Sequence, residues 1–597
     1  MLLTKKFLLP LLTIAVLFPF NSDLLSQENS DLKKEVVVIG TLIPTEFSKT
    51  TRHITILTRE DIMQLPVSSV SELMKYIPGI DMRERGPNGI QGDLSIRGSN
   101  FSQVVIMING VKISDPQTAH HNMDIPVSLG EIERIEVLHG QGSSVYGKNA
   151  FSGAINIITR ENDKNTAFGK LSYGEHQTTG ANISFTQTAE NFWYTTALDY
   201  TRSDGFEFNR DFDIINIMAT SQWNQALGTF ELLAGYNKKD FGANNFYGPY
   251  PSKEWTRTGF FSLQGELKNI RINTFYRRHS DRFLLDINRP EWYVNTHITQ
   301  TYGMDIHTLY RLREKNRVIL GSEIQKDTIK SDGLGEHTNT NISLYSEYEA
   351  SFTEMFYLNL GFRSDFFSGY PAQFNPNVSL ALILSPKLKI RGSAGRAFRI
   401  PSFTELYYFS PANIGNPKLK PEKNLSFEAG FDYFPLNTLT WEMTFFLRQD
   451  RDLIDWAKQN IQDPWKVQNI HKALFFGVDT RLQWGSNFSF GYNYIRSNVK
   501  QIPDRHTKYA FNHPVHHISA AFVFDLPFSV KTGLFSTYKK RRFGKGYLVL
   551  DIKLSKRYKQ WEFFMKITNL LDIFYEEIPG ISMPGRWLTA GFRFIMN

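Results

Sequence analysis

A glycine-containing run in the first third of the chain has the residue types of a phosphate-binding loop. Residues 142–149 read Gly-Ser-Ser-Val-Tyr-Gly-Lys-Asn, which places Asn149 where Ser or Thr must ligate magnesium. A phosphate loop must also open a helix whose N-terminus faces the phosphate, whereas residues 150–159 indicate a strand. The run therefore does not predict nucleotide binding.

A histidine pair raises the question of a metal site. His120 and His121 are followed by Met123 and Asp124, and imidazole with a thioether would suit copper. Adjacent histidines in a loop more often make hydrogen bonds, and the sequence offers no spaced third ligand. We therefore assign no metal site.

Composition excludes several classes of function. The 597-residue chain has no Gly-x-Ser-x-Gly elbow and no His-Glu-x-x-His zinc motif. It contains no cysteine, which excludes disulfides and thiolate chemistry. The net charge of +8 is not concentrated in a Lys/Arg block, and no nucleic-acid module is present. We expect no enzymatic activity, no cofactor and no nucleic-acid partner.

The first residues have the pattern of a secretory signal. Lys5 and Lys6 precede an apolar run at residues 7–20, which is short for a membrane span. We assign residues 1–26 to a signal peptide. No later segment has eighteen consecutive apolar residues, so a membrane would have to be crossed by strands.

Residues 51–165 predict a small α+β domain. Short β-branched runs end at glycine or Asn-Gly, as in residues 94–98 and 105–110, which is typical of small sheets with tight turns. Thr58 with Asp61, and Ser68 or Ser69 ahead of residues 70–76, indicate two helix starts. Pro78-Gly79 would end the second helix.

From about Lys170 onward, apolar and polar residues alternate with a period of two. Residues 548–554 are an example, since Asp551 and Lys553 lie between Leu550, Ile552 and Leu554. Lipid outside and water inside require this alternation, although some soluble sandwiches share it. Short turns such as residues 484–487 alternate with long polar stretches such as residues 238–254 and 500–514. About 430 residues at roughly twenty per strand and connection predict about 22 antiparallel strands in a membrane barrel.

The same residues carry a family resemblance. Ile96-Arg97-Gly98, Asn109-Gly110, Ile132 to Val137 and residues 153–159 resemble the plug of TonB-dependent outer-membrane transporters. Residues 394–407 and 568–572 resemble the barrel of that family. In size and style, the chain is similar to its cobalamin or ferric-siderophore transporters. The resemblance implies an N-terminal plug at residues 51–165 that occludes a barrel at residues 166–597.

The resemblance also implies an energy-coupling segment at residues 27–50. A short β-prone run there resembles the TonB box, whose backbone would add a strand to a TonB-type periplasmic partner. The same run could instead be the first strand of the plug. Its residues are Glu35, Val36, Val37, Val38, Ile39 and Gly40.

A second implication of the resemblance is a latch between plug and barrel. In the family, two plug arginines tend to pair with two barrel acids. Arg97 matches the first arginine, and His139 stands where the second is typical. Glu428 and Asp479 match the acids by motif position, although they could equally be ordinary wall charges that meet solvent. Histidine would make half of this latch titratable.

By their place in the family pattern, two plug loops and several barrel loops face outward and would contact cargo. The predicted plug-loop contacts are Arg85, Asn88, Gln91, His120, His121 and Asp124. The predicted barrel-loop contacts are Phe246, Tyr247, Tyr250, Trp255 and Tyr407. Aromatic surface with a few polar groups suits a bulky amphipathic ligand, although about half of these aromatics could simply pack loop against loop.

Together these features predict a monomeric active transporter of the bacterial outer membrane. It would capture a scarce, bulky nutrient, either a cobalamin-like corrinoid or a ferric siderophore or haem. The alternative is a passive pore or surface adhesin, which would need neither the box at residues 35–40 nor a plug.

Overall fold

A computed structural model describes residues 36–42, 44–162, 164–313, 315–500, 506–508 and 511–596. The predicted signal peptide and Glu35 lie outside the described residues. Among the described residues, no helix is long and apolar enough to span a membrane.

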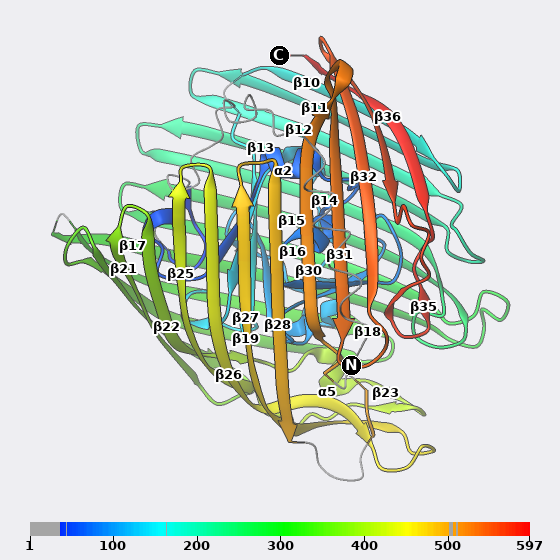
Figure 1. Cartoon of the computed structure of the whole chain (residues 1–597). Coiled ribbons are helices and arrows are strands. Elements are labelled where there is room, and N and C mark those ends of the chain that lie inside the picture. The colour runs from blue at the N-terminus through cyan, green and yellow to red at the C-terminus, as the bar shows by residue number, and fades with distance from the viewer. Residues whose placement is uncertain are drawn as a thin grey trace, which may run out of the picture.

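The larger unit is a closed antiparallel barrel, as the sequence predicts (Figure 1). Twenty-two strands of the described chain form its wall, and β10 pairs with β36 to close it. The wall strands are β10 (Thr166–Gly174), β11 (Thr178–Ala189), β12 (Phe192–Ser203), β13 (Phe212–Gln225), β14 (Gly228–Asn244), β15 (Pro251–Leu267), β16 (Ile270–Leu284), β17 (Val294–Arg313), β18 (Asn316–Ser331), β19 (Gly335–Ser351), β20 (Phe356–Phe367), β21 (Gln373–Ser385), β22 (Leu388–Arg399), β25 (Glu422–Leu436), β26 (Leu439–Lys458), β27 (Trp465–Trp484), β28 (Phe488–Lys500), β30 (Pro514–Leu526), β31 (Val530–Arg541), β32 (Tyr547–Tyr558), β33 (Trp561–Thr568) and β36 (Trp587–Met596).

Strand β21 shows which face of the wall meets which solvent. Phe374 is 54% exposed and Val378 39%, whereas the intervening Asn375 and Asn377 are buried. Successive side chains of a strand point to opposite faces, so the outer face is apolar and the lumen is polar. This arrangement fits a wall surrounded by lipid.

The two rims of the barrel differ. One rim has tight turns, such as the one between β27 and β28. The other carries the longer connections, which include α5 (Phe403–Tyr407) and the short strands β23 (Phe409–Ser410), β24 (Asn413–Ile414), β29 (His506–Thr507), β34 (Glu576–Ile578) and β35 (Ile581–Ser582). The predicted loop at residues 238–254 is mostly strand, because β14 ends at Asn244 and β15 begins at Pro251. In barrels of this type, the rim with long loops faces outward.

The plug lies inside the ring of strands, where its blue elements are visible in Figure 1. Its central sheet has the order β3-β8-β9-β6-β7, with β6 parallel to β9. The strands are β3 (Ile54–Thr58), β8 (Ile132–His139), β9 (Gly153–Thr159), β6 (Val104–Ile108) and β7 (Val111–Lys112), and β4 (Ile80–Glu84) pairs with β5 (Gly92–Ile96) beside them. The α+β plug therefore has the predicted class.

Both expected helices of the plug are present. Helix α2 (Arg59–Gln64) begins with a capping box in which the Thr58 side chain accepts from the Asp61 N–H. Helix α3 (Val70–Leu73) is capped by Ser69 and continues as the 3₁₀ turn η4 (Met74–Tyr76). The phosphate-loop interpretation stays excluded, because residues 143–146 form only the one-turn helix α4 (Ser143–Tyr146) and residues 153–159 are strand.

The N-terminal end of the described chain is bound to the plug. Strand β1 (Val36–Val37) pairs with β2 (Thr45–Glu46), and Val37 and Ile39 are buried. The Val38 N–H donates to Glu136 Oε2 at 3.0 Å, and the Gly40 N–H donates to the Tyr146 hydroxyl at 2.9 Å. This strand is not part of the five-stranded sheet.

Candidate functional site

Arg97 joins the plug to two wall strands. It follows β5, is 3% exposed, and has a positive φ of 52°. Its Nη1 lies 2.5 Å from Glu428 Oε1 on β25, and its Nε lies 2.7 Å from Asp479 Oδ2 on β27. A buried guanidinium between two carboxylates is costly to break by removal of one partner. The geometry is therefore suited to hold the plug in place.

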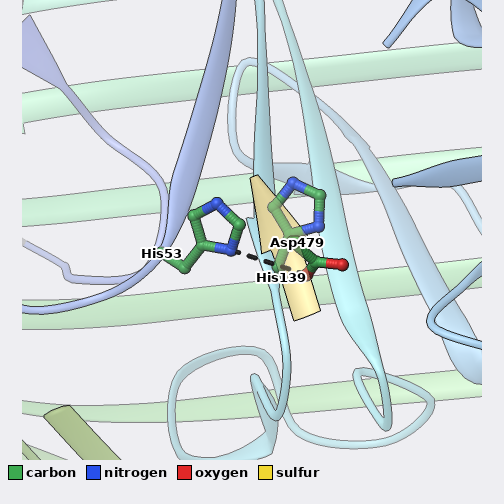
Figure 2. A group of neighbouring side chains, drawn as sticks. All are labelled: His53, His139 and Asp479. Carbon is green, nitrogen blue, oxygen red and sulfur yellow. Dashed lines mark ion pairs between the residues drawn. The ribbon is translucent and has the colours of Figure 1, made fainter. Parts of the chain in front are cut away.

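The second latch position differs from the prediction. No carboxylate of the described residues lies within ion-pair distance of His139. Its Nε2 is 3.0 Å from Thr55 Oγ1, and its ring stacks on His53 with centroids 4.4 Å apart. His53 Nδ1 in turn accepts from Arg97 Nη2 at 3.0 Å and lies 3.9 Å from Asp479 Oδ2 (Figure 2). The prediction that His139 pairs directly with the acids was wrong, because its Nε2 contacts Thr55 and the histidine beside Arg97 and Asp479 is His53.

Both histidines are held neutral. Burial and the positive charge of Arg97 hold the pKa of His139 well below its ordinary value of 6.5. Burial, the neighbouring His139 and the Arg391 charge do the same for the pKa of His53. We call Arg97, Glu428, Asp479, His53 and His139 the Arg97 junction.

The outward plug loops are joined to one another by a second group of contacts. Arg85 Nη1 lies 2.9 Å from Asp93 Oδ2, and His120 Nδ1 lies 2.6 Å from Asp93 Oδ1. The His120 ring stacks on Phe101 at 4.3 Å and remains partly exposed. Although burial opposes it, these two partners hold the pKa of Asp93 below its ordinary range. His120 is the better placed of the two histidines for cargo contact.

Two other predicted plug-loop residues are bound within the protein. Gln91 is buried, and its Nε2 donates to the Tyr247 hydroxyl at 2.6 Å. The Asn88 N–H donates to Glu72 Oε1 at 2.9 Å, and Asn88 has a positive φ of 59°. Gln91 can therefore act on cargo only through Tyr247, which is 47% exposed.

His121 and Asp124 lie beneath the loop surface. His121 is 3% exposed, with its Nε2 3.5 Å from Asp281 Oδ2. Asp124 is 4% exposed and pairs with Lys239 at 2.7 Å and His279 at 3.1 Å. Burial alone would lower the pKa of His121, but the hydrogen bond and charge of Asp281 raise it to about 10. As direct cargo contacts, His121 and Asp124 were misplaced, because both side chains face the wall.

The barrel aromatics divide into two groups. Tyr247 and Tyr250 are exposed, and Tyr407 stacks on His337 with centroids 3.5 Å apart. Phe246 is 5% exposed and packs under its loop. The prediction that Trp255 is a loop residue was wrong. It lies on β15 between Glu254 and Thr256, which both face the lumen. Trp255 therefore points to the outer face, where Arg282 lies 5.2 Å from its ring.

A cavity of about 410 Å³, open to solvent, lies between the plug and the rim of long loops. Arg85, Asp93 and Phe101 contribute from the plug. Its charged lining carries no excess of cations: it comprises Arg83, Arg85, Arg448, Lys508, Asp93, Glu422, Asp450, Asp455 and Glu577. Such a cavity can enclose much of a bulky ligand.

Three residues of these contacts were missed from the sequence. The only sequence signal for Glu254 and Asp281 was a charge at a lumen-facing position of an alternating strand. Both acids lie more than 130 positions from His121 along the chain, so their contact with it has no local signal. His53 had no local signal. These residues come together only when the plug is placed in the barrel.

Comparison with known proteins decides the family. Residues 150–570 match the family described as "TonB dependent receptor-like, beta-barrel", and residues 46–154 match "TonB-dependent Receptor Plug Domain". The chain belongs to the TonB-dependent receptor family. It is therefore an outer-membrane receptor of a bacterium and not an enzyme.

Individual relatives are distant but span the chain. A vitamin B12 transporter, BtuB, of Photobacterium profundum is 22% identical over 91% of this chain and 92% of its own length. The BtuB of Vibrio vulnificus is 23% identical over 80% of this chain and 79% of its own length.

Solved structures share the fold. The FrpB iron transporter of Neisseria meningitidis aligns with a TM-score of 0.76 at 14% identity, over 92% of this chain and 99% of that one. The siderophore receptor PirA of Acinetobacter baumannii aligns with a TM-score of 0.74 at 16% identity, with the same coverage.

Proposed function

We propose that this receptor imports a cobalamin-like corrinoid across the outer membrane, driven by a TonB-type periplasmic protein. The observation that carries the proposal is the buried Arg97 junction, which fixes a plug across the lumen. A passive pore or an adhesin would need no such closure. The names of the two BtuB relatives favour a corrinoid as the cargo.

The outward cavity supports a bulky, nearly neutral ligand. Its lining mixes acids and bases, so it offers no concentrated positive charge to a polyanionic ferric catecholate. Exposed Tyr247 and Tyr250, with His120 and Phe101, supply rigid aromatic area near the plug loops. Rigid aromatics with a few polar groups suit a large amphipathic molecule.

Energy coupling would begin at residues 35–40. The backbone of Val36 to Ile39 would add to a strand of the periplasmic partner, with little demand on side chains. In the described structure, Val36 and Val37 pair with Glu46 and Thr45. The partner would therefore compete with this pairing and pull on the first residues of the plug.

The test is equilibrium binding of purified protein to cyanocobalamin, to haem and to several ferric chelates, with each affinity measured by calorimetry. We expect saturable binding of the corrinoid and at least tenfold weaker binding of the others. Tighter binding of a ferric chelate or haem would replace the corrinoid as cargo. Absence of binding by all of them would contradict the transporter proposal and favour the pore or adhesin.

A further inference from the structure

A second buried acidic pair lies between the plug and the wall, on the outward side. His121 comes from the plug turn η6 (Ala119–His121), Glu254 from β15 and Asp281 from β16. One potential ligand atom from each of the three lies within 4.8 Å of the others. Asp281 is paired in register with Thr256, so Glu254 and Asp281 are diagonal neighbours on the lumen face.

Among the described residues, these two carboxylates have no lysine or arginine partner, and the basic group within ion-pair distance of Asp281 is the His121 imidazole. Glu254 is 1% exposed and Asp281 5%, and Glu254 Oε1 and Asp281 Oδ1 each lack a hydrogen-bond partner in the described chain. Burying an ionised carboxylate is costly unless it is paired or coordinates a metal. The site therefore has unsatisfied oxygen donors beside an imidazole.

Two neighbouring groups of similar composition differ in this respect. In the group of His53, His139 and Asp479, the carboxylate is already bound by Arg97. In the group of His121, Asp124 and His279, Lys239 lies 2.7 Å from Asp124. A divalent ion at either place would meet a fixed positive charge. Of the three groups, only the one that contains Glu254 and Asp281 has no lysine or arginine in an ion pair with its acids.

We propose that His121, Glu254 and Asp281 bind a divalent transition-metal ion of the Zn²⁺ class. Zn²⁺ accepts both imidazole nitrogen and carboxylate oxygen as ligands, and three protein ligands leave a further position of a four-coordinate ion open. The Tyr247 hydroxyl donates to Glu254 Oε2 at 3.0 Å, and Asp124 Oδ2 lies 3.7 Å from His121 Nδ1, so both ligands have orienting neighbours.

The ion would join the plug to the wall. His121 belongs to the plug, whereas Glu254 and Asp281 belong to adjacent wall strands, so coordination spans the boundary. Movement of this plug loop would then break a metal–ligand bond. The site is independent of cargo identity, and it adds a metal-dependent clamp on the outward side.

The test is equilibrium dialysis of tag-free, full-length protein in detergent against ZnCl₂, with bound metal measured by mass spectrometry. We expect one Zn²⁺ per chain, and at least tenfold weaker binding in the isosteric double variant Glu254→Gln/Asp281→Asn. The matched control is His53→Gln, which changes a buried histidine of the other junction and should leave Zn²⁺ binding unchanged.

Heat-modifiable gel mobility would establish that each variant is folded. If the double variant does not fold, Zn²⁺ binding is measured in the single variant Asp281→Asn instead. The visible absorption spectrum of Co²⁺ bound to the parent protein provides a second readout of the same site. Loss of the parent's Co²⁺ spectrum in His121→Gln, but not in His53→Gln, supports the site. Zn²⁺ binding absent from the parent, or equal in parent and acid variants, or weakened by His53→Gln, would overturn it.

Discussion

Two of the buried contacts between plug and wall contain an acidic pair from the wall, and the two pairs are balanced in different ways. At the Arg97 junction, Glu428 and Asp479 share one guanidinium, which is charged at any physiological pH. At the outward pair, Glu254 accepts from the Tyr247 hydroxyl and Asp281 lies beside His121, and each acid retains an oxygen without a hydrogen-bond partner in the described chain. We call His121, Glu254 and Asp281 the His121 junction. The two junctions therefore differ in their cation and not in their acids. An arginine makes the first a structural latch, whereas the second has none and is the proposed metal site.

The largest effect should come from removing the permanent cation. Arg97→Ala would leave Glu428 and Asp479 buried and unpaired, at a cost of about 3–5 kcal/mol. We expect a lower thermal midpoint and greater sensitivity of cells to large antibiotics such as vancomycin.

A charge-neutral control separates this cause from lost packing. Adding Glu428→Gln and Asp479→Asn to Arg97→Ala removes the stranded charges and should restore part of the stability. Equal antibiotic sensitivity of Arg97→Ala and the parent would show that this junction does not hold the plug.

The neutral histidines of the Arg97 junction predict acid sensitivity. The unfolded chain takes up protons near pH 6.5 at His53 and His139, whereas the folded chain keeps both neutral beside Arg97, Arg391 and Arg481. Stability should therefore be full above pH 6.5 and fall below it, by up to about 1.4 kcal/mol per histidine for each pH unit. The measurement is the thermal midpoint between pH 5 and 8. A double variant with both histidines changed to Gln should show a flatter profile, and an unchanged profile would refute the assignment.

On the outward side, His120 tests cargo contact and is not itself one of the proposed metal ligands. His120→Ala would remove the ring that stacks on Phe101 and should weaken corrinoid binding about tenfold, a loss of about 1.4 kcal/mol. Calorimetry on folded protein measures this. His513→Ala is the control, since it changes a histidine that is not part of this stack. Unaltered affinity in His120→Ala would remove this loop from the binding site.

These predictions depend on features that differ in how visible they are in the sequence. Alternation with a period of two predicted the wall, and Thr58 with Asp61 predicted a helix start, because both patterns are local. The prediction for Trp255 depended on where β15 begins. The sequence predicted a loop as far as residue 254, but β15 begins at Pro251, so Trp255 lies on the strand and on its outer face. The meeting of His121 with Glu254 and Asp281 depends on docking the plug in the barrel. No local pattern encodes that contact.

The smallest effect should come from Tyr247→Phe. This change removes hydroxyl contacts with Gln91 and Glu254 at the His121 junction, each worth about 0.5–1.5 kcal/mol. We expect a small decrease in thermal midpoint and no change in antibiotic sensitivity, because the Arg97 junction is untouched. An increase in antibiotic sensitivity as large as that of Arg97→Ala would erase the distinction between the two junctions.

In the proposed import, the plug must release its contacts with the wall, and the force acts at residues 35–40. Val37→Pro removes a backbone N–H and fixes φ, which should prevent strand addition to the periplasmic partner. Val37→Ala keeps the N–H and is the matched control. The decisive measurement is uptake of labelled cyanocobalamin by cells that lack any other corrinoid transporter. We predict that Val37→Pro abolishes uptake while surface binding persists, and that Val37→Ala retains uptake; full uptake by the proline variant would contradict energy-coupled import.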